Sequence, residues 1–397
     1  MSKINSKSFV FKCALLSISM LLMAAPNIAA AIPLMSKSFT GQSASAIETI
    51  STIPNLGIII GIFISSLLAN LCGQKRTVMI GLAIALIFGI TPAFSNNYYV
   101  VIISRLLLGL GIGLFNSLAI SMISDFYSGD ELATMMGFQN AINSLGSSIL
   151  SFLVGYLIIL GWHATFWIYA IALPIMILFG AVIPNVKSGK KSNRRSQHQK
   201  INLPIILISV LTFFIYVFFM AITVKLADLM TYKNIGTASQ AATILGTFTL
   251  VTMLVSFVYG YIHKLLKKST LTIGFLLMTI GFVILASANT ISKVTVGVVI
   301  VGLGFAIVIP YIYTIINTVA PKGSENLAAS IMLIFTNIGV FISPTLINYL
   351  SRFLGNSQPD TNMRVCAYGF TILFLISAVI LIIQKLVRGG RKIVKEN

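Results

Sequence analysis

The sequence predicts an all-α membrane protein with twelve transmembrane helices in two six-helix bundles. Hydrophobic residues make up 57% of its 397 residues and charged residues only 9%. The mean hydropathy is +0.97, well outside the balance of a water-soluble domain. Apolar runs of about 18 to 25 residues, the length that crosses roughly 30 Å of hydrocarbon as a helix, recur along the chain. The second half of the chain also resembles the first, which predicts the division into two bundles.

The individual spans follow from the apolar runs between short polar breaks. We expect them at residues 12–34, 45–69, 77–95, 99–124, 134–160, 163–184, 203–230, 239–262, 270–288, 294–318, 326–350 and 366–385. The first run also has features of a secretory signal peptide, because lysines precede it and small residues follow in "NIAAAIP". We interpret it as a span because it continues through Met35 and because the repeat requires it as a partner.

The distribution of positive charge predicts the orientation. With both termini in the cytoplasm, twenty of the 27 Lys and Arg residues fall in inner segments and only five in outer ones, as the positive-inside rule requires. The net charge of +19 is then explained by topology and anionic lipid headgroups. The basic stretch "KSGKKSNRRSQHQK" (187–200) lies between the sixth and seventh spans, so we interpret it as a solvated linker and expect no nucleic-acid partner.

Nothing in the sequence indicates an enzyme or a metal site. The three cysteines and three histidines are scattered without paired spacing. No P-loop and no catalytic serine, cysteine or histidine cluster is visible. We therefore expect neither cofactor nor metal, and no ATP-driven pump.

The repeat sets the domain boundaries. "LLLGLGIGLFNSLAISMISDFY" (106–127) matches "VIVGLGFAIVIPYIYTIINTVA" (299–320), and "NSLGSSILSFLVGYL" (143–157) matches "TNIGVFISPTLINYL" (336–350). We expect an N-terminal bundle over 1–184, a cytoplasmic basic linker over 185–202 and a C-terminal bundle with a short basic tail over 203–397. Duplicated six-helix halves are typical of secondary transporters, whose substrate site lies between the halves.

Two motifs make the chain resemble the major facilitator superfamily. The first is the loop "SLLANLCGQKRTVMIG" (66–81), in which Gly73, Lys75 and Arg76 are in register with the signature of the family. Asn70 stands where the family places aspartate. The resemblance implies a loop that latches the cytoplasmic gate. Without that carboxylate the loop lacks the acidic partner of a charge-based latch. The alternative is that Lys75 and Arg76 are only topology determinants.

The second motif is an arginine followed by two glycines in the fourth span, here Arg105, Gly109 and Gly111. A cation inside a membrane helix costs on the order of 3 kcal/mol, so it normally faces a protein partner or a wet cavity. The resemblance implies that spans one, four, seven and ten line a central cavity, and it links this arginine to proton coupling in many drug exporters. Arg105 lies roughly 9 Å from the outer end of its span, so snorkelling outward remains the alternative. The glycines allow close helix packing.

A second charged group lies near the outer end of the seventh span, where Lys225 and Asp228 are three residues apart. The spacing favours a local ion pair at the headgroup level, with a gating or coupling role as the alternative. We expect Glu48, at the outer start of span two, to be solvated. Asp228 is then the one carboxylate on a span that the resemblance places at the cavity, and we predict that it exchanges a proton.

The remaining intramembrane polar residues are candidates for substrate contact or for interhelical hydrogen bonds. They are Asn27, Asn116, Gln139, Asn143, Tyr311 and Tyr313.

These observations predict a monomeric secondary transporter for a small-molecule substrate. We expect it to be a multi-pass protein of a bacterial plasma membrane, in contact with membrane lipids. A mostly apolar, Met- and Phe-rich lining with one or two charges favours proton-coupled efflux of a hydrophobic or amphipathic solute. The glycine-proline pair usual in drug antiporters is absent, since Leu150 and Ser151 occupy its place. An uptake permease for a small nutrient or metabolite is therefore the alternative. A transporter-like receptor or scaffold is a third reading, which the absence of an extra soluble domain disfavours.

Overall fold

The computed structural model describes residues 8–184, 201–321 and 324–396. These residues form helices joined by short loops and contain no strand, so the predicted fold class is confirmed. The basic segment expected to link the two bundles lies almost entirely outside the described residues.

The first half of the chain forms one bundle. Its helices are α1 (Phe9–Ser17), η1 (Ile18–Leu21), η2 (Ala25–Ala31), α2 (Ile32–Ser38), α3 (Ala44–Thr52), α4 (Pro54–Cys72), α5 (Gln74–Ile90), η3 (Thr91–Phe94), α6 (Tyr98–Phe126), α7 (Gly129–Leu157), η4 (Ile158–Leu160), η5 (Trp162–Ile171) and α8 (Ala172–Val182).

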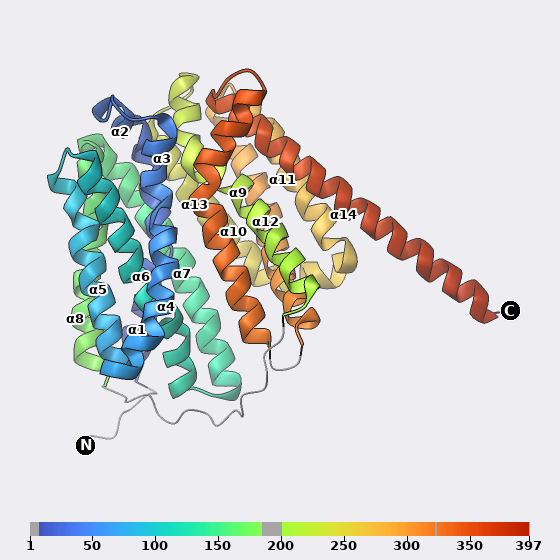
Figure 1. The fold of residues 1–397 in the computed structure, drawn as a ribbon, viewed down its shortest axis with the longest axis horizontal. Helices are drawn as coiled ribbons and strands as arrows, with labels where there is room; N and C mark the ends of the chain where they lie inside the picture. Colours follow the sequence, from blue (N-terminus) through green and yellow to red (C-terminus); the bar gives the residue numbers. More distant parts are fainter. Residues whose placement is uncertain (1–7, 185–200, 322–323, 397) are drawn as a thin grey trace.

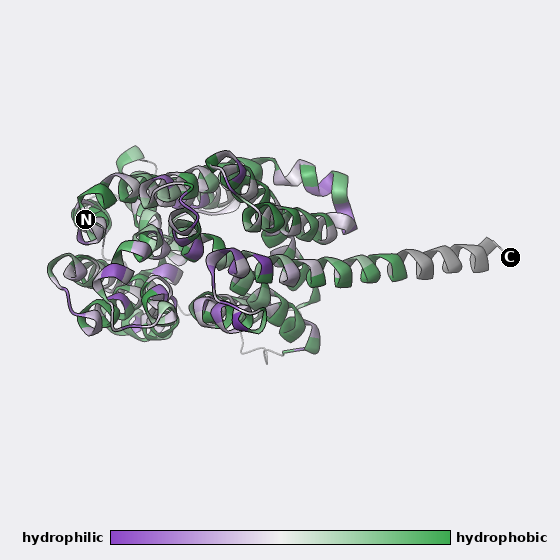
Figure 2. Ribbon diagram, turned by 90° about the horizontal axis from the view of Figure 1, so that it is seen from above, coloured by the Kyte–Doolittle hydropathy of each residue, from purple (hydrophilic) through white to green (hydrophobic). Residues whose placement is uncertain are grey.

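The second half forms the other bundle. Its helices are α9 (Leu203–Tyr232), α10 (Ala238–Leu266), η6 (Lys267–Ser269), α11 (Thr270–Ala286), α12 (Ile291–Val319), α13 (Glu325–Phe353) and α14 (Pro359–Glu396). Figure 2 shows that hydrophobic residues dominate the helices of both bundles.

Among the described residues, ten helices are long and apolar enough to cross a membrane, or eleven if one bent pair counts as a single span. One of the ten, Ala238–Ala286, is 49 residues long and includes both α10 and α11. The chain breaks between them at Lys267, whose φ is +48°. Separating these two helices and including the bent pair yields the twelve expected segments.

Two of the segments differ from the expected ones. The last begins at Pro359 rather than at 366, so Asp360 and Arg364 belong to the first turns of α14 instead of a loop. They form an i, i+4 ion pair of 3.6 Å there. The first segment is broken, because Phe9–Leu21 and Ala25–Ser38 meet at an angle of 46°.

The break in the first span has a local cause. Pro26 and Pro33 follow one another within eight residues, and each removes a backbone donor from the helix. The segment Ala25–Ala31, which includes Pro26 and directly follows the break, forms the 3-10 helix η2, whose i→i+3 hydrogen bonds do not continue an α-helical pattern. Span seven, the repeat counterpart, has no internal proline and runs as one 30-residue helix, α9.

Close packing inside the N-terminal bundle depends on the glycines of α6. A Cβ atom at Gly111 would lie 2.7 Å from the carbonyl oxygen of Gly81 on α5. A Cβ at Gly109 would collide with the backbone of Pro54 at the start of α4. The expected packing role of these glycines is confirmed.

In the part of the chain that the structure describes, the hydrogen bonds between the bundles lie towards one end. We call the end where α8 finishes (Val182) and α9 begins (Leu203) the connection end, and the opposite end, where α3 begins and α13 finishes, the distal end. Figure 1 shows the bundles meeting at the distal end and diverging towards the connection end. Hydrogen bonds cross between them from Ser148 to the Gly246 carbonyl (2.8 Å) and from Thr52 to the Phe341 carbonyl (3.2 Å). Ser148, Gly246 and Phe341 lie in the distal halves of α7, α10 and α13, and Thr52 is the last residue of α3, the short helix that begins at the distal end.

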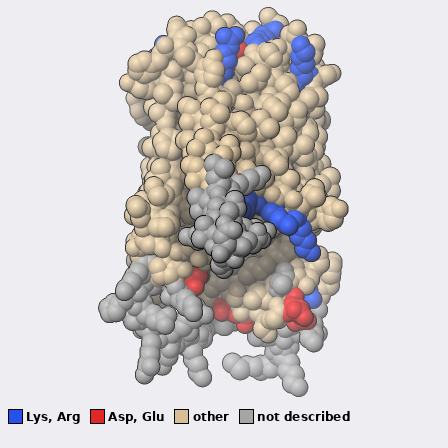
Figure 3. Space-filling view, turned by 90° about the vertical axis from the view of Figure 1, so that its right-hand side faces the viewer, with Lys and Arg blue, Asp and Glu red and all other residues tan. Residues whose placement is uncertain are grey.

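The surface also differs between the two ends of the molecule. Figure 3 shows Lys and Arg side chains at the distal end and again beside a recess in the lower half of the face, with Asp and Glu side chains below the recess. The molecule is therefore closed at the distal end and splayed at the connection end, one of the two states that alternating access requires.

Candidate functional site

The first buried cation is Arg105, which lies inside the N-terminal bundle with 0% of its surface exposed. Its Nε donates to the carbonyl of Ile50 on α3 (3.0 Å), and its Nη1 donates to the Tyr169 hydroxyl on η5 (2.7 Å). Its Nη2 donates to the carbonyl of Ala25 in the broken first span. The guanidinium also lies 5.3 Å from the centre of the Tyr169 ring, within cation–π range.

Proline chemistry explains why Arg105 binds these carbonyls. In an unbroken helix the Ile50 carbonyl would accept a hydrogen bond from residue 54, but that residue is Pro54 and has no N–H. The Ala25 carbonyl lies in the 3-10 segment that breaks the first span. An unpaired carbonyl buried in a membrane protein is costly. Arg105 therefore supplies the donor that Pro54 cannot give to the Ile50 carbonyl, and it adds a donor to the Ala25 carbonyl at the start of η2.

This placement decides one alternative left by the sequence. Arg105 does not snorkel, because it is fully buried. Each hydrogen bond of its guanidinium ends on the N-terminal bundle. In this conformation the arginine faces the interior of its own bundle, and no part of it is open to a cavity between the bundles.

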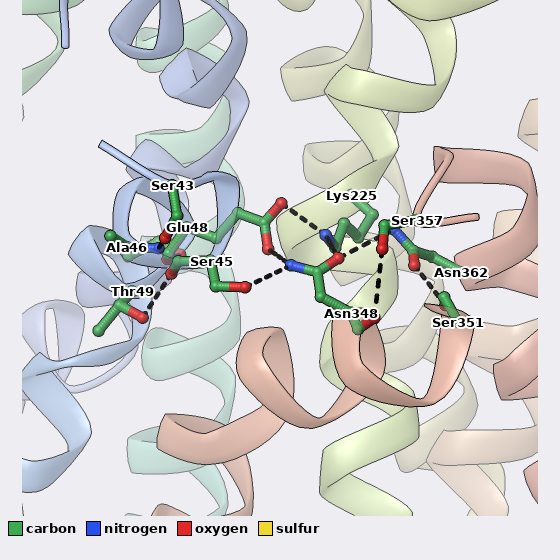
Figure 4. Close-up of polar contacts among 11 residues, drawn as sticks. Ser43, Ser45, Ala46, Glu48, Thr49, Lys225, Asn348, Ser351, Ser357 and Asn362 are labelled. Atoms are coloured by element: carbon green, nitrogen blue, oxygen red, sulfur yellow. Dashed lines mark hydrogen bonds and ion pairs between the residues drawn. The ribbon is translucent and has the colours of Figure 1, made fainter. Parts of the chain in front are cut away.

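The second buried cation is Lys225, and its counter-ion comes from the other bundle. Lys225 Nζ lies 2.5 Å from Glu48 Oε1, with 3% of each side chain exposed. Glu48 lies on α3 and Lys225 on α9, so the ion pair joins the two halves of the molecule at the distal end (Figure 4).

Asn348 of α13 completes the link. Its Oδ1 accepts a hydrogen bond from Lys225 Nζ (2.6 Å), and its Nδ2 donates to Glu48 Oε2 (2.8 Å) and to the Ser45 hydroxyl (2.9 Å). Asn362 of α14 donates weakly to the same Oδ1 (3.4 Å). We call Glu48, Lys225 and Asn348 the inter-bundle triad. A buried ion pair needs such extra hydrogen bonds to offset desolvation.

Two expectations about these charges were wrong. Glu48 was expected to be solvated, yet only 2% of the residue is exposed, because α13 and α9 cover it. Lys225 was expected to pair with Asp228, but its ammonium instead points across the interface to Glu48. Residues three apart on a helix are close enough to pair, but the buried Glu48 carboxylate offers Lys225 a better desolvated partner. Asp228 is half-buried on α9 one turn closer to the distal end.

The polar residues of the N-terminal bundle separate into two kinds. Asn27 is satisfied inside the bundle, since its amide donates to the Ser147 carbonyl (3.2 Å) and its Oδ1 accepts from the hydroxyls of Ser147 and Ser151 (3.3 Å each). Asn143, on the same helix α7, has a buried Oδ1 with no hydrogen-bond partner. An unsatisfied buried acceptor is unusual, which makes Asn143 the better candidate for substrate contact.

The other candidates are distributed over both bundles. Gln139 on α7 is 5% exposed, whereas Asn116 on α6 is half-buried. On α12, Tyr313 is 40% exposed, and the Tyr311 ring lies 5.4 Å from the ring of His263. Tyr311 therefore contacts α10 within the C-terminal bundle.

The loop between α4 and α5 makes its contacts inside the N-terminal bundle. Gly73 has φ +89°, a conformation that favours glycine at the turn. Lys75 donates to the Gly180 carbonyl at the end of α8 (2.6 Å), and Gln74 donates to Asp125 Oδ2 (2.9 Å). Asn70 and Arg76 are exposed. The loop thus lies at the open connection end, with these bonds tying it to its own bundle.

Sequence reasoning missed two groups. The first is the pairing of Glu48 with Asn348, because no repeat or spacing predicts contacts between α3 and α13. The second is an aromatic cluster in the C-terminal bundle, in which Phe219 stacks on Phe305 (3.7 Å between ring centroids) and Tyr216 meets Phe305 edge-on (5.5 Å). The aromatic residues at positions i and i+3 of "YVFF" (216–219) were the sequence pattern that could have indicated this cluster.

The described residues contain no group of three His, Cys, Asp or Glu side chains that could hold a metal ion.

Comparison with known proteins places this geometry in a family. The chain is similar to an uncharacterized transporter of Rickettsia felis, with 28% identity over 40% of this chain and 39% of that protein. It is 24% identical to a TsgA homolog of Buchnera aphidicola over 85% of this chain and 87% of that protein. It is also 23% identical to the quinolone resistance protein NorA of Staphylococcus aureus over 82% and 84% of the two chains.

The fold has solved counterparts. The crystal structure of a D-xylose-proton symporter superimposes with a TM-score of 0.71 at 16% identity, covering 93% of this chain and 97% of the other. The model of the Major Facilitator Superfamily matches residues 13–233 and 204–395. With its two helical bundles and its bacterial relatives, this chain is a multi-pass transporter of the plasma membrane, not an enzyme, and it belongs to the Major Facilitator Superfamily.

Proposed function

We propose that this secondary transporter exports a small hydrophobic or amphipathic solute in exchange for protons. The observation that carries the proposal is the inter-bundle triad, a buried ion pair whose two charges belong to different bundles. A transporter that alternates between two open states must make and break contacts at each end in turn. The triad is a contact of this kind.

The proposal includes an orientation. The excess of Lys and Arg supports a cytoplasmic connection end. The conformation described here is then closed towards the outside and open towards the cytoplasm. In this state an exporter takes up its solute.

Proton coupling follows from the chemistry of the triad. Ionised Glu48 and Lys225 attract each other strongly because both are desolvated. Protonation of Glu48 removes its charge and leaves the Lys225 ammonium without a counter-ion, so the closed distal end is destabilised. Asp228 is a second carboxylate on the same helix, one turn nearer the distal end, where a proton can reach it once the bundles separate.

The substrate class rests on an aromatic cluster of the C-terminal bundle. The stacked rings of Phe219 and Phe305, with Tyr216 and Phe248 around them, offer apolar and aromatic surface that suits a planar hydrophobic solute. Asn143 adds an unsatisfied acceptor. The relation to a quinolone resistance protein supports the same class.

Transport in membrane vesicles tests the proposal. Everted vesicles that respire pump protons inward, so an exporter of this type accumulates ethidium, a planar hydrophobic cation, in their lumen. We expect gradient-dependent accumulation that an uncoupler abolishes and that vesicles with an empty vector lack. Gradient-driven accumulation of solutes only in right-side-out vesicles would instead establish uptake. Transport that the uncoupler leaves unchanged in both preparations would refute proton coupling.

A further inference from the structure

The C-terminal bundle contains a pocket of about 440 Å³ away from the interface between the bundles. Residues of α9, α11, α12 and α14, together with Lys268 of η6, line it. Figure 1 shows α14 leaning away from the bundle towards its C-terminal end, which widens the space between α14 and its neighbours. Neither the inter-bundle triad nor Arg105 contributes to the lining.

The pocket is apolar along its length and carries a charge at one end. Its floor includes Phe275, which is 1% exposed, and its wall includes Ile376 and Ile380, which are about half exposed on the outside of the bundle. Lys268, at the connection end, is the one charged residue among the lining residues that the structure describes. Lys264 and Lys267 are exposed beside it. The chemistry is that of an amphiphile with a long apolar part and an anionic head.

The dimensions fit one leaflet of a membrane. The lining of α14 extends from Leu373 to Leu381, a distance of roughly 12 Å at 1.5 Å per residue. Half of a hydrocarbon core is roughly 15 Å thick. The pocket therefore begins at the headgroup level of the leaflet at the connection end and reaches most of the way to the midplane.

The geometry points to a binding site for an anionic phospholipid of the cytoplasmic leaflet, with an acyl chain against Phe275 and Ile376 and the headgroup phosphate at Lys268. A basic residue at this depth attracts anionic lipids. The half-exposed wall lets a lipid enter sideways from the bilayer. The inference uses the orientation proposed above, whereas lipid retention can be measured without transport.

Native mass spectrometry of the purified full-length protein tests the site with phosphatidylglycerol and phosphatidylethanolamine as probes. The wild type should retain one phosphatidylglycerol more tightly than phosphatidylethanolamine. Lys268→Gln should weaken phosphatidylglycerol binding about five-fold, which corresponds to about 1 kcal/mol. Ser377→Trp should reduce the binding of this lipid without changing charge, because the indole fills the pocket.

Matched variants separate the pocket from general effects. Arg76→Gln removes an exposed positive charge at the same end of the other bundle, and Val379→Trp adds an indole to the exposed face of α14 outside the pocket lining. Both should retain phosphatidylglycerol like the wild type. Melting temperatures in detergent verify folding. Equal retention of phosphatidylglycerol by the wild type, Lys268→Gln and Ser377→Trp would overturn the proposal, and so would equal retention of the two lipids.

Discussion

Among the residues whose burial the structure describes, each bundle buries one cation, and the two bundles satisfy it in different ways. The N-terminal bundle surrounds Arg105 with carbonyls and a hydroxyl of its own helices. The C-terminal bundle presents Lys225 at the interface, where its counter-ion is Glu48 of the other bundle. The first arrangement survives any rigid movement of one bundle against the other. The second cannot survive a separation at the distal end.

The difference shows that burial alone does not reveal the role of a charged residue. Both side chains are almost completely inaccessible, and an intramembrane charge is a functional candidate by default. The origin of the partners distinguishes the two roles. The partners of Arg105 all belong to its own bundle, whereas Lys225 binds Glu48 of the other bundle and is the cation that we propose changes partners as the transporter alternates.

Replacing Arg105 should have the largest effect on stability. In Arg105→Ala the carbonyls of Ile50 and Ala25 lose their donors and a cavity remains, so we expect the free energy of unfolding to fall by about 3–5 kcal/mol. Lysine should rescue only part of this loss, because an ammonium cannot reach three acceptors in the directions that a guanidinium does. Thermal unfolding in detergent measures the change.

Arg364→Ala is the matched control. The Arg364 side chain is 58% exposed and forms a surface ion pair with Asp360, which contributes at most about 1 kcal/mol. Similar melting temperatures for the two alanine variants would contradict a structural role for Arg105.

Breaking the triad should have a smaller effect on stability and a larger one on transport. Glu48→Gln and Lys225→Met each leave one buried charge uncompensated, at a cost of about 3 kcal/mol. The double variant should recover most of that stability, since no lone charge remains. It should still lack proton-driven transport, because the titratable partner is gone.

A double-mutant cycle of melting temperatures and vesicle transport measures both effects. Additive losses of stability would mean that Glu48 and Lys225 do not interact in the folded protein. Proton-driven transport in the double variant would remove Glu48 from the coupling mechanism.

Asp228 should show the smallest change in stability. Its carboxylate does not form the ion pair with Lys225, so Asp228→Asn should change the free energy of unfolding by less than about 1 kcal/mol. We expect proton-driven transport to be lost while solute exchange without a gradient continues. Recovery of driven transport on adding Lys225→Met would contradict this, because it would show that the two charges merely balance each other.

The sequence predicted the helices well because each of them follows from the length and composition of an apolar run. It also identified Arg105 and Lys225, since a charge inside such a run stands out. It could not predict their partners. The acceptors of Arg105 are the Ile50 carbonyl, which Pro54 leaves without a helix donor, the Ala25 carbonyl of η2 and the Tyr169 hydroxyl. Which of these groups meet depends on how the spans pack.

The partners of Lys225 were missed for a related reason. Glu48 stands at a helix end, where a solvated carboxylate is the usual interpretation, and only the contact between α3, α9 and α13 buries it. The three-residue spacing on α9 favoured Asp228 as the partner of Lys225 instead. Local patterns thus reveal which residues are unusual, whereas the tertiary contacts decide what those residues bind.

The central claim is that the Glu48–Lys225 pair keeps the distal end closed. Spin labels at Gly41 and Arg352, both exposed at the distal end on different bundles, report its opening once Cys13, Cys72 and Cys366 are replaced. Electron–electron double resonance should give a single short distance for the protein with native Glu48 and Lys225 at neutral pH. Glu48→Gln should add a longer distance at the same pH. An unchanged distance distribution in Glu48→Gln would contradict the claim.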